Sequence, residues 1–156
     1  MEIIRRHEKK NIVLKDAVLI EGLPGIGNVS KITVDFLISE TKAKPYLDYY
    51  SDIFPHSVFV DENSVAHLPK VSIHYVKGGK RRKPIIFVSG DVQATSEKGS
   101  YSLSEFIVKK AKSMGAKQII TLGGIGRKQI PKKQKLHIVV SGEKMKKKMK
   151  LSLIHI

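Results

Sequence analysis

The sequence predicts an α/β fold with a mostly parallel sheet that helices cover on both faces. Three short apolar runs, each followed by a loop that contains glycine, are typical of buried parallel strands. Segments with apolar residues at helical spacing follow or precede them. The chain order is strand, helix, hairpin region, strand, helix, strand, which is the alternation expected of this class.

The first buried strand is expected at Ala17–Leu23, an apolar run that ends in a glycine-containing turn. A helix over Val29–Glu40 should follow, with Asn28 or Ser30 as the residue that caps its free backbone N–H groups. The apolar stripe expected on this helix consists of Val29, Ile32, Phe36 and Leu37, widened by Val34 and Ile38.

The middle of the chain reads as extended structure from Pro45 onward. Ser57–Asp61 and Val65–Leu68 should form a hairpin. Val71–Val76 alternates apolar and polar residues, as a half-exposed strand does. A basic turn at Gly78–Lys83 then leads to the second buried strand.

That second strand is expected at Pro84–Ser89, and a polar loop over residues 90–100 follows it. A helix capped by Ser102 or Ser104 should run to about Met114. The third buried strand is Gln118–Leu122. Further along, Leu136–Val140 reads as a fourth strand, and a lysine-rich helix begins at Glu143.

We expect a single α/β domain over residues 1–150, incomplete at its C-terminal end. The lysine-rich helix has no finished C-terminus before the last six residues, Leu151–Ile156. The same six residues are encoded by CTG TCT CTT ATA CAC ATC, the end of a common transposase sequencing adapter. Residues 151–156 are therefore expected to be a non-native tail.

Composition restricts the function classes. The 156-residue chain has no cysteine, which excludes disulfide scaffolds, cysteine nucleophiles and zinc fingers. It has no apolar run of the roughly 18 residues that a membrane helix needs. The N-terminus turns polar too early for a signal peptide. We therefore expect a cytoplasmic protein without a membrane segment.

The formal net charge is +15, and lysine is concentrated after Arg127. Proteins that bind nucleic acid through such charge usually interleave aromatic residues with it. The segment after Arg127 contains no aromatic residue. We therefore interpret the lysines as a solvated surface and do not expect a nucleic-acid partner.

Three loops that follow the expected buried strands are candidate ligand-binding or structural sites. If the strands are parallel, these loops meet at the carboxyl edge of the sheet, where α/β proteins bind ligands. The first has neither the dinucleotide glycine spacing nor the lysine of a P-loop. Gly25→Val should impair folding if the backbone there needs glycine. The candidate residues are Gly22, Gly25, Gly27 and Asn28, then Gly90, Asp91 and Gln93, then Gly123, Gly124 and Gly126.

The sequence predicts no catalytic residues, no metal site and no cofactor. Asp91 stands without a second acid or a nearby histidine, so capping of a turn is its expected role. The six histidines show no helical i, i+4 pair of the kind that binds zinc. His56 follows Phe54-Pro55, and we expect a structural or surface role for it.

Five segments resemble the archaeal branch of the proteasome assembly chaperone 2 family. They are Glu21–Lys31 (EGLPGIGNVSK), Ser51–Val60 (SDIFPHSVFV, which contains Pro55 and His56), Leu68–Lys70 (LPK), Ser89–Ala94 (SGDVQA) and Thr121–Gly126 (TLGGIG). The resemblance implies a three-layer sandwich similar to nucleoside phosphorylases. It also implies a homo-oligomer that binds proteasome α subunits and assists assembly of the core particle.

Some members end in a hydrophobic-Tyr-any motif that docks between α subunits, and this chain ends without tyrosine. Two other functions stay open. One is a nucleotide- or small-molecule-binding enzyme of ATP-grasp type that uses the glycine loops. The other is a basic protein that binds nucleic acid. The oligomer number and the partner-binding face are not predicted.

Overall fold

The computed structural model describes residues 1–80, 82–127, 129 and 136–153. The chain divides into two compact units, Met1–Gly126 and Arg127–Ile156, where the sequence predicted one domain over 1–150. The described part of the second unit contains the expected lysine-rich helix, α3 (Glu143–Leu153). Leu136–Val140 forms no strand, so that prediction is wrong. Residues 154–156 of the expected tail lie outside the described residues.

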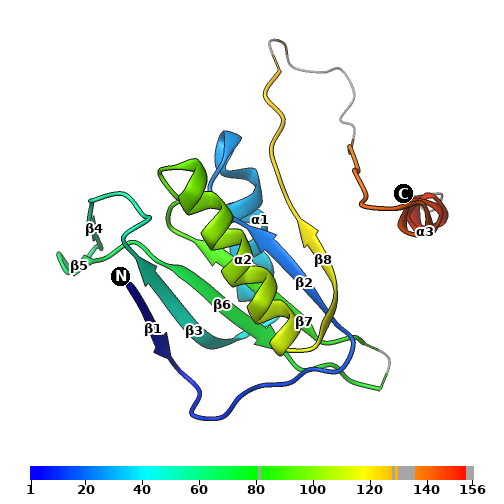
Figure 1. The fold of residues 1–156 in the computed structure, drawn as a ribbon, viewed down its shortest axis with the longest axis horizontal. Helices are drawn as coiled ribbons and strands as arrows, with labels where there is room; N and C mark the ends of the chain where they lie inside the picture. Colours follow the sequence, from blue (N-terminus) through cyan, green and yellow to red (C-terminus); the bar gives the residue numbers. More distant parts are fainter. Residues whose placement is uncertain (81, 128, 130–135, 154–156) are drawn as a thin grey trace. The chain divides into compact units, whose positions relative to one another are not determined.

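The first unit is built on a six-stranded sheet (Figure 1). The strand order across the sheet is β1-β3-β6-β7-β2-β8. The strands are β1 (Glu2–Arg6), β2 (Ala17–Gly22), β3 (Lys44–Ser51), β6 (Val71–Val76), β7 (Ile85–Gly90) and β8 (Ala116–Thr121). A separate hairpin of β4 (Phe59–Val60) and β5 (Ala66–His67) confirms the hairpin expected between Ser57 and Leu68.

The sheet is mixed, so the prediction of a mostly parallel sheet is wrong. β2 pairs in parallel with β7 and β8. The pairings β1·β3, β3·β6 and β6·β7 are antiparallel. The physical reason lies in the connections, because a parallel pair requires a long crossover, whereas the short turn from β6 into β7 permits only an antiparallel pair. The expected likeness to nucleoside phosphorylases stays a prediction.

The three strands expected to be adjacent do lie side by side, in the order β7-β2-β8. The expectation that all three are buried is wrong for β8, which is an edge strand in the described sheet. Its residues alternate between half-buried and exposed, and Ile119 is 41% exposed. An edge strand has a neighbour on one side only, so its side chains receive less cover.

Helix α2 (Glu97–Ser113) covers one face of the sheet (Figure 1). It begins earlier than predicted, because Ser96 is the N-cap and its Oγ accepts the Gly99 N–H at 3.1 Å. Its buried face follows the predicted spacing. The buried face consists of Leu103, Ile107 and Ala111, with Met114 at the C-cap. It packs into the main core, which also contains Leu19, Tyr49 and Ile86.

Helix α1 (Val29–Glu40) covers the opposite face of the sheet, over β2 and β7 (Figure 1). Its buried residues are Ser30 and Val34, whereas Ile32 is 63% exposed and Phe36 is 61% exposed. The predicted apolar stripe therefore points mostly away from the sheet. Neither predicted cap residue acts as one, since Asn28 makes no side-chain cap bond and Ser30 Oγ donates to the Leu23 carbonyl at 2.6 Å.

The edge position of β8 can be tested with two residues that are register partners on the same face, Leu19 and Ile119. Leu19 is fully buried, so Leu19→Ala should lower the free energy of unfolding by roughly 3 kcal/mol. Ile119→Ala should cost less than about 1 kcal/mol because its side chain already meets solvent. Urea denaturation measures both. Equal costs would show that β8 is covered in the folded protein.

Candidate functional site

The three glycine loops meet at one edge of the sheet, as expected from their positions after β2, β7 and β8. The Leu122 N–H donates to the Glu21 carbonyl at 2.9 Å, which joins the third loop to the first. The Gln93 side-chain amide donates to the Pro24 carbonyl, which joins the second loop to the first. The sequence-predicted residues of the three loops therefore form one cluster.

Close packing explains three of the glycines in this cluster. A Cβ at Gly22 would lie 2.3 Å from the Ser30 carbonyl oxygen of α1. At Gly90 it would lie 2.7 Å from Leu23 Cδ2, and at Gly124 it would lie 2.2 Å from the Ile26 carbonyl oxygen. Each distance is shorter than a Cβ contact can be. Gly22 and Gly124 therefore let two backbone segments approach each other, whereas the nearest atoms at Gly90 are the ends of the Leu23 and Val71 side chains.

Backbone conformation explains Gly27 but not Gly25. Gly27 has φ 65° and Asn28 has φ 51°, both in the left-handed region that favours these residue types. Gly25 has φ −163°, an extended conformation that any residue adopts. A Cβ there would meet nothing nearer than Gln93 Nε2 at 3.9 Å. The expectation that Gly25 needs a glycine backbone is therefore wrong.

A small cavity of about 170 Å³ lies beside the loops on the α2 face, lined by residues that include Glu21, Gln93 and Thr121. Burial raises the pKa of Glu21, against the opposing effect of the Leu23 N–H that its carboxylate accepts at 3.0 Å. Pockets for small molecules usually enclose about 300–1000 Å³. A ligand-binding role for the glycine loops stays a prediction.

Asp91 connects segments that are distant in sequence. Its Oδ2 accepts the Lys70 backbone N–H at 3.3 Å, and its own N–H donates to the Lys70 carbonyl at 2.9 Å. Its Oδ1 lies 3.9 Å from Lys31 Nζ, which also pairs with Asp35 at 2.9 Å. Three of the family-like segments, which contain Lys31, Lys70 and Asp91, are thus brought together on the α1 face.

A second carboxylate beside this group, Asp48 on β3, was missed by the sequence analysis. It is buried and accepts three hydrogen bonds, from Ser72 Oγ at 2.6 Å, from Lys70 Nζ at 2.9 Å and from His7 Nε2 at 3.0 Å. Burial alone would raise the pKa of Asp48, but the hydrogen bonds from Ser72, Lys70 and His7 together lower it. Every partner lies on another segment, so sequence spacing gives no signal for this group.

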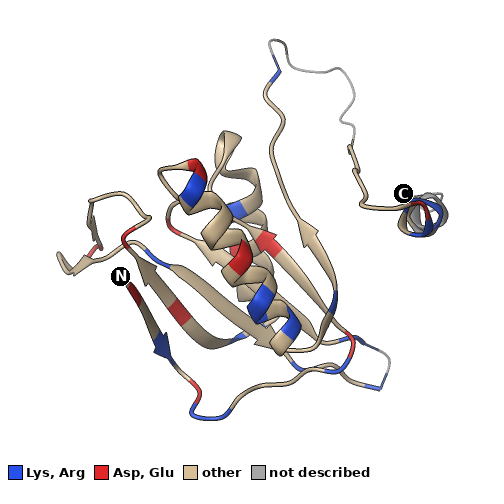
Figure 2. Ribbon diagram, viewed as in Figure 1, with Lys and Arg blue, Asp and Glu red and all other residues tan. Residues whose placement is uncertain are grey.

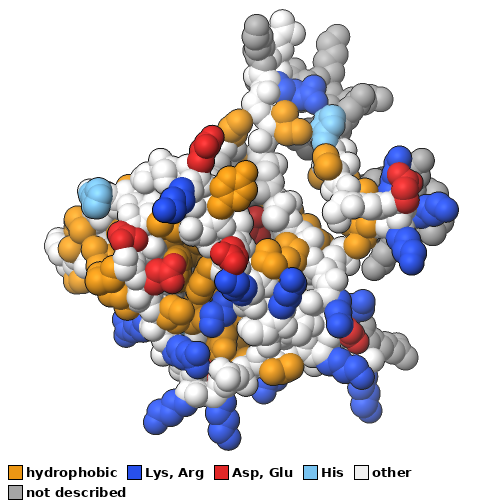
Figure 3. Space-filling model, in the orientation of Figure 1, with side chains coloured by type: hydrophobic (Ala, Val, Ile, Leu, Met, Phe, Trp, Pro, Cys, Tyr) orange, Lys and Arg blue, Asp and Glu red, His pale blue; other side chains and the backbone are white. Residues whose placement is uncertain are grey.

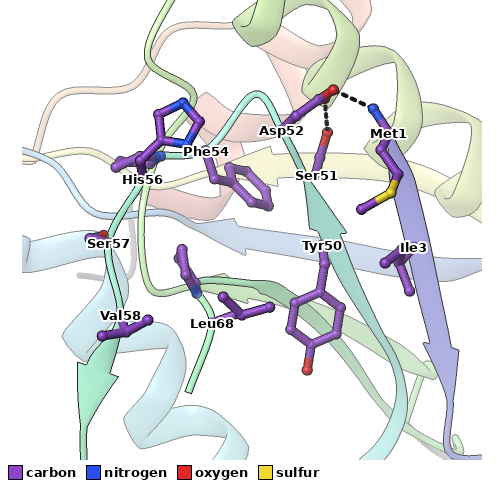
Figure 4. Close-up of a pocket in the computed structure, with 12 residues that line it drawn as sticks. Met1, Ile3, Tyr50, Ser51, Asp52, Phe54, His56, Ser57, Val58 and Leu68 are labelled. Carbon is purple, nitrogen blue, oxygen red and sulfur yellow. Dashed lines mark hydrogen bonds and ion pairs between the residues drawn. The ribbon is translucent and has the colours of Figure 1, made fainter. Parts of the chain in front are cut away.

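An apolar pocket of about 540 Å³ lies between the start of β1, the end of β3 and the segment that leads to β4 (Figure 4). Ile3, Tyr50, Phe54 and Leu68 supply much of its lining. Pro55 and His56, the two residues expected from the family-like motif, also line it. Beside the pocket, the amino group of Met1 pairs with the Asp52 carboxylate, as the dashed line in Figure 4 marks.

The β4–β5 hairpin carries an unusual number of exposed apolar side chains. We call residues 58–68 the apolar arm. Figure 3 shows hydrophobic side chains gathered at the end of the molecule where this arm lies. A second hollow of about 530 Å³ shares Tyr50 and Leu68 with the apolar pocket. The exposed large apolar residues of the arm are Val58, Phe59, Val60, Val65 and Leu68.

Within the described ranges, no group of three His, Asp or Glu side chains is placed to hold a metal ion. No helix in that part of the chain is long and apolar enough to cross a membrane. Together, the fold and the surface features define an α/β protein with clustered glycine loops, a polar group on the α1 face and an apolar pocket beside an exposed apolar arm.

The chain belongs to the PAC2 family, whose model matches residues 19–154. It is 33% identical over 150 residues to the uncharacterized protein MJ1210 of Methanocaldococcus jannaschii, a match that covers 96% of this chain and 57% of that protein. The chain therefore spans little more than half the length of this relative.

Solved structures with the same fold include two from Pyrococcus furiosus. PbaB, described as an archaeal proteasome activator, is 34% identical with a TM-score of 0.77, and the match covers 83% of this chain and 54% of PbaB. PbaA, described as an archaeal homolog of proteasome-assembly chaperone, is 22% identical with a TM-score of 0.60, over 85% of this chain and 53% of PbaA. The likeness to PbaA shows the fold alone.

Two nearby glycines differ in packing, so alanine substitutions at Gly22 and Gly25 should differ in their effect on stability. Gly22→Ala should lower the free energy of unfolding by about 2 kcal/mol or more, because α1 must move away from β2. Gly25→Ala should change it by less than about 0.5 kcal/mol. Thermal and urea denaturation of both variants test this. A large loss at Gly25 would mean that the loop has a different conformation.

The lowered pKa of Asp48 predicts a pH dependence of stability. A carboxyl group whose folded pKa is depressed stabilises the fold above its unfolded pKa of about 4, and this contribution is lost as the pH falls through the folded pKa. Asp48→Asn should therefore lower stability at pH 7 by roughly 2 kcal/mol and flatten the acid dependence. Ser72→Ala, which removes one donor, should give an intermediate result. An unchanged acid profile in Asp48→Asn would contradict this assignment.

Proposed function

We propose that this chain is a proteasome assembly chaperone-like protein that binds proteasome α subunits and assists assembly of the core particle. The observation that carries the proteasome as partner is the match to PbaB, a proteasome activator by its description, at 34% identity and a TM-score of 0.77. The assembly role rests on the family-like segments of the sequence. Membership of the PAC2 family supports the same partner class. The proposal implies a cytoplasmic protein that acts by contact.

The apolar arm and the pocket beside it are the surface that we assign to the partner. Contiguous exposed apolar side chains are typical of surfaces that contact another protein. Val60 is 65% exposed and Phe59 is 45% exposed, although both lie in a regular hairpin. The arm also adjoins the pocket lined by Pro55 and His56. An anchor side chain of the partner would fit a pocket of about 540 Å³.

The proposal can be tested with two exposed residues of matched exposure. Val60 on the arm is 65% exposed and Ile32 on α1 is 63% exposed, so neither substitution by Asp should unfold the protein. Val60→Asp should weaken binding to purified α subunits by about tenfold or more, and Ile32→Asp should leave it unchanged. Surface plasmon resonance measures the affinity of both variants for the α subunits. Absence of binding by the unaltered chain, or equal loss in both variants, would refute the proposal.

Activation of assembled proteasomes is the second candidate, because PbaB is described as an activator. The two roles separate in one experiment. An assembly factor should raise the yield of core particles formed from separate α and β subunits, without changing the peptidase activity of finished particles. An activator should raise peptidase activity of finished particles and leave the yield unchanged. Native mass spectrometry gives the yield, and a fluorogenic peptide gives the activity.

A further inference from the structure

Strand β1 is an exposed edge of the described sheet. It pairs with β3 on one side and with no other described strand on the second side. All five of its residues, Glu2–Arg6, are exposed, including two isoleucines. A free edge of this kind offers backbone N–H and C=O groups to another strand. Strand β1 can therefore pair with one further strand on its outer side.

The backbone hydrogen bonds show which residues face outward. The His7 N–H donates to the Tyr46 carbonyl at 2.9 Å, and the Met1 carbonyl accepts the Asp52 N–H at 3.3 Å. Residues 1 and 7 thus direct these groups toward β3. Because the direction alternates along an antiparallel strand, residues 3 and 5 also face β3. The backbone groups of Glu2, Ile4 and Arg6 therefore point away from the sheet.

We propose that β1 pairs with β1 of a second copy of this chain, antiparallel and centred on Ile4. In a two-fold symmetric antiparallel pair, one residue must lie opposite its own copy. Centred on Ile4, the pair places Glu2 opposite Arg6 of the second copy at both ends. Ile4 then lies opposite Ile4 of the second copy. All three outward-facing residues take part in hydrogen-bonded pairs.

The other symmetric registers are less favourable. A pair centred on Arg5 places two arginines opposite each other, which is repulsive. A pair centred on Ile3 leaves Arg6 without an opposite residue in the strand. Figure 2 shows the acidic start and the basic end of β1, which are the charges that the Ile4 register matches. The inference goes beyond the proposed function and does not depend on it, because it concerns only copies of this chain.

A charge exchange tests the proposed pair. Glu2→Arg alone and Arg6→Glu alone each place like charges opposite each other, and each should weaken self-association by roughly tenfold or more. The double variant Glu2→Arg/Arg6→Glu should restore it. An equimolar mixture of the two single variants should also associate, because each supplies the charge that the other lacks. Sedimentation velocity distinguishes the monomer from the associated pair in each sample.

A control variant shows whether Glu2→Arg weakens self-association through the pair or through a lost contact within one copy. Tyr49 Oη donates to Glu2 Oε1 at 2.9 Å, so Glu2→Arg also removes a bond inside the first unit. Tyr49→Phe removes that bond without changing charge, and it should leave self-association intact. Single variants that associate as the unaltered protein does, or a double variant that stays dissociated, would overturn the proposal.

Hydrogen exchange on the unaltered chain gives a test that needs no variant. The amides of Ile3 and Arg5 bond within one copy, so their protection should not depend on protein concentration. The amides of Ile4 and Arg6 face outward, so their protection should rise with protein concentration as the pair forms. Exchange rates at Ile4 and Arg6 that do not change with protein concentration would refute the pair. A chain that remains monomeric at every concentration tested would also refute it.

Discussion

The close approach of helix α1 to strand β2 at Gly22 determines much of the first unit. The Ser30 carbonyl lies where a Cβ of residue 22 would stand, so only glycine permits this packing. The packing sets the path of the loop from β2 into α1. It also places the Lys31 side chain of α1 beside Asp91 at the end of β7. Close packing thus accounts for glycine at positions 22 and 124 of these loops, and a positive φ accounts for it at position 27.

The two faces of the sheet have different characters. The α2 face holds the main apolar core, in which Tyr49 stacks on Phe106 with ring centroids 4.0 Å apart. The α1 face carries the polar group around Asp48 and Asp91, and α1 packs chiefly over β2 and β7. The apolar pocket and the apolar arm lie beyond that helix. The part of the sheet that α1 leaves free thus adjoins the apolar arm, since Tyr50 of β3 and Phe59 of the arm line the same hollow.

Sequence patterns predicted the helices, the hairpin and the three adjacent strands, because these depend on local spacing of apolar residues. They missed β1, whose five residues are exposed and show no apolar alternation. They also assigned Ile32 and Phe36 to a buried face, since spacing cannot tell which side of an apolar helix meets the sheet. The Asp48 group could not be predicted, because strand pairing alone brings its donors together.

The most direct test of the central claim is a hydrogen–deuterium exchange footprint of α subunits on the full chain. The account predicts that residues 54–68, the apolar arm with its adjoining motif, become protected when α subunits are added. It also predicts that the glycine loops at residues 22–28, 90–94 and 123–126 do not change. Protection of the glycine loops with no change in residues 54–68 would contradict it.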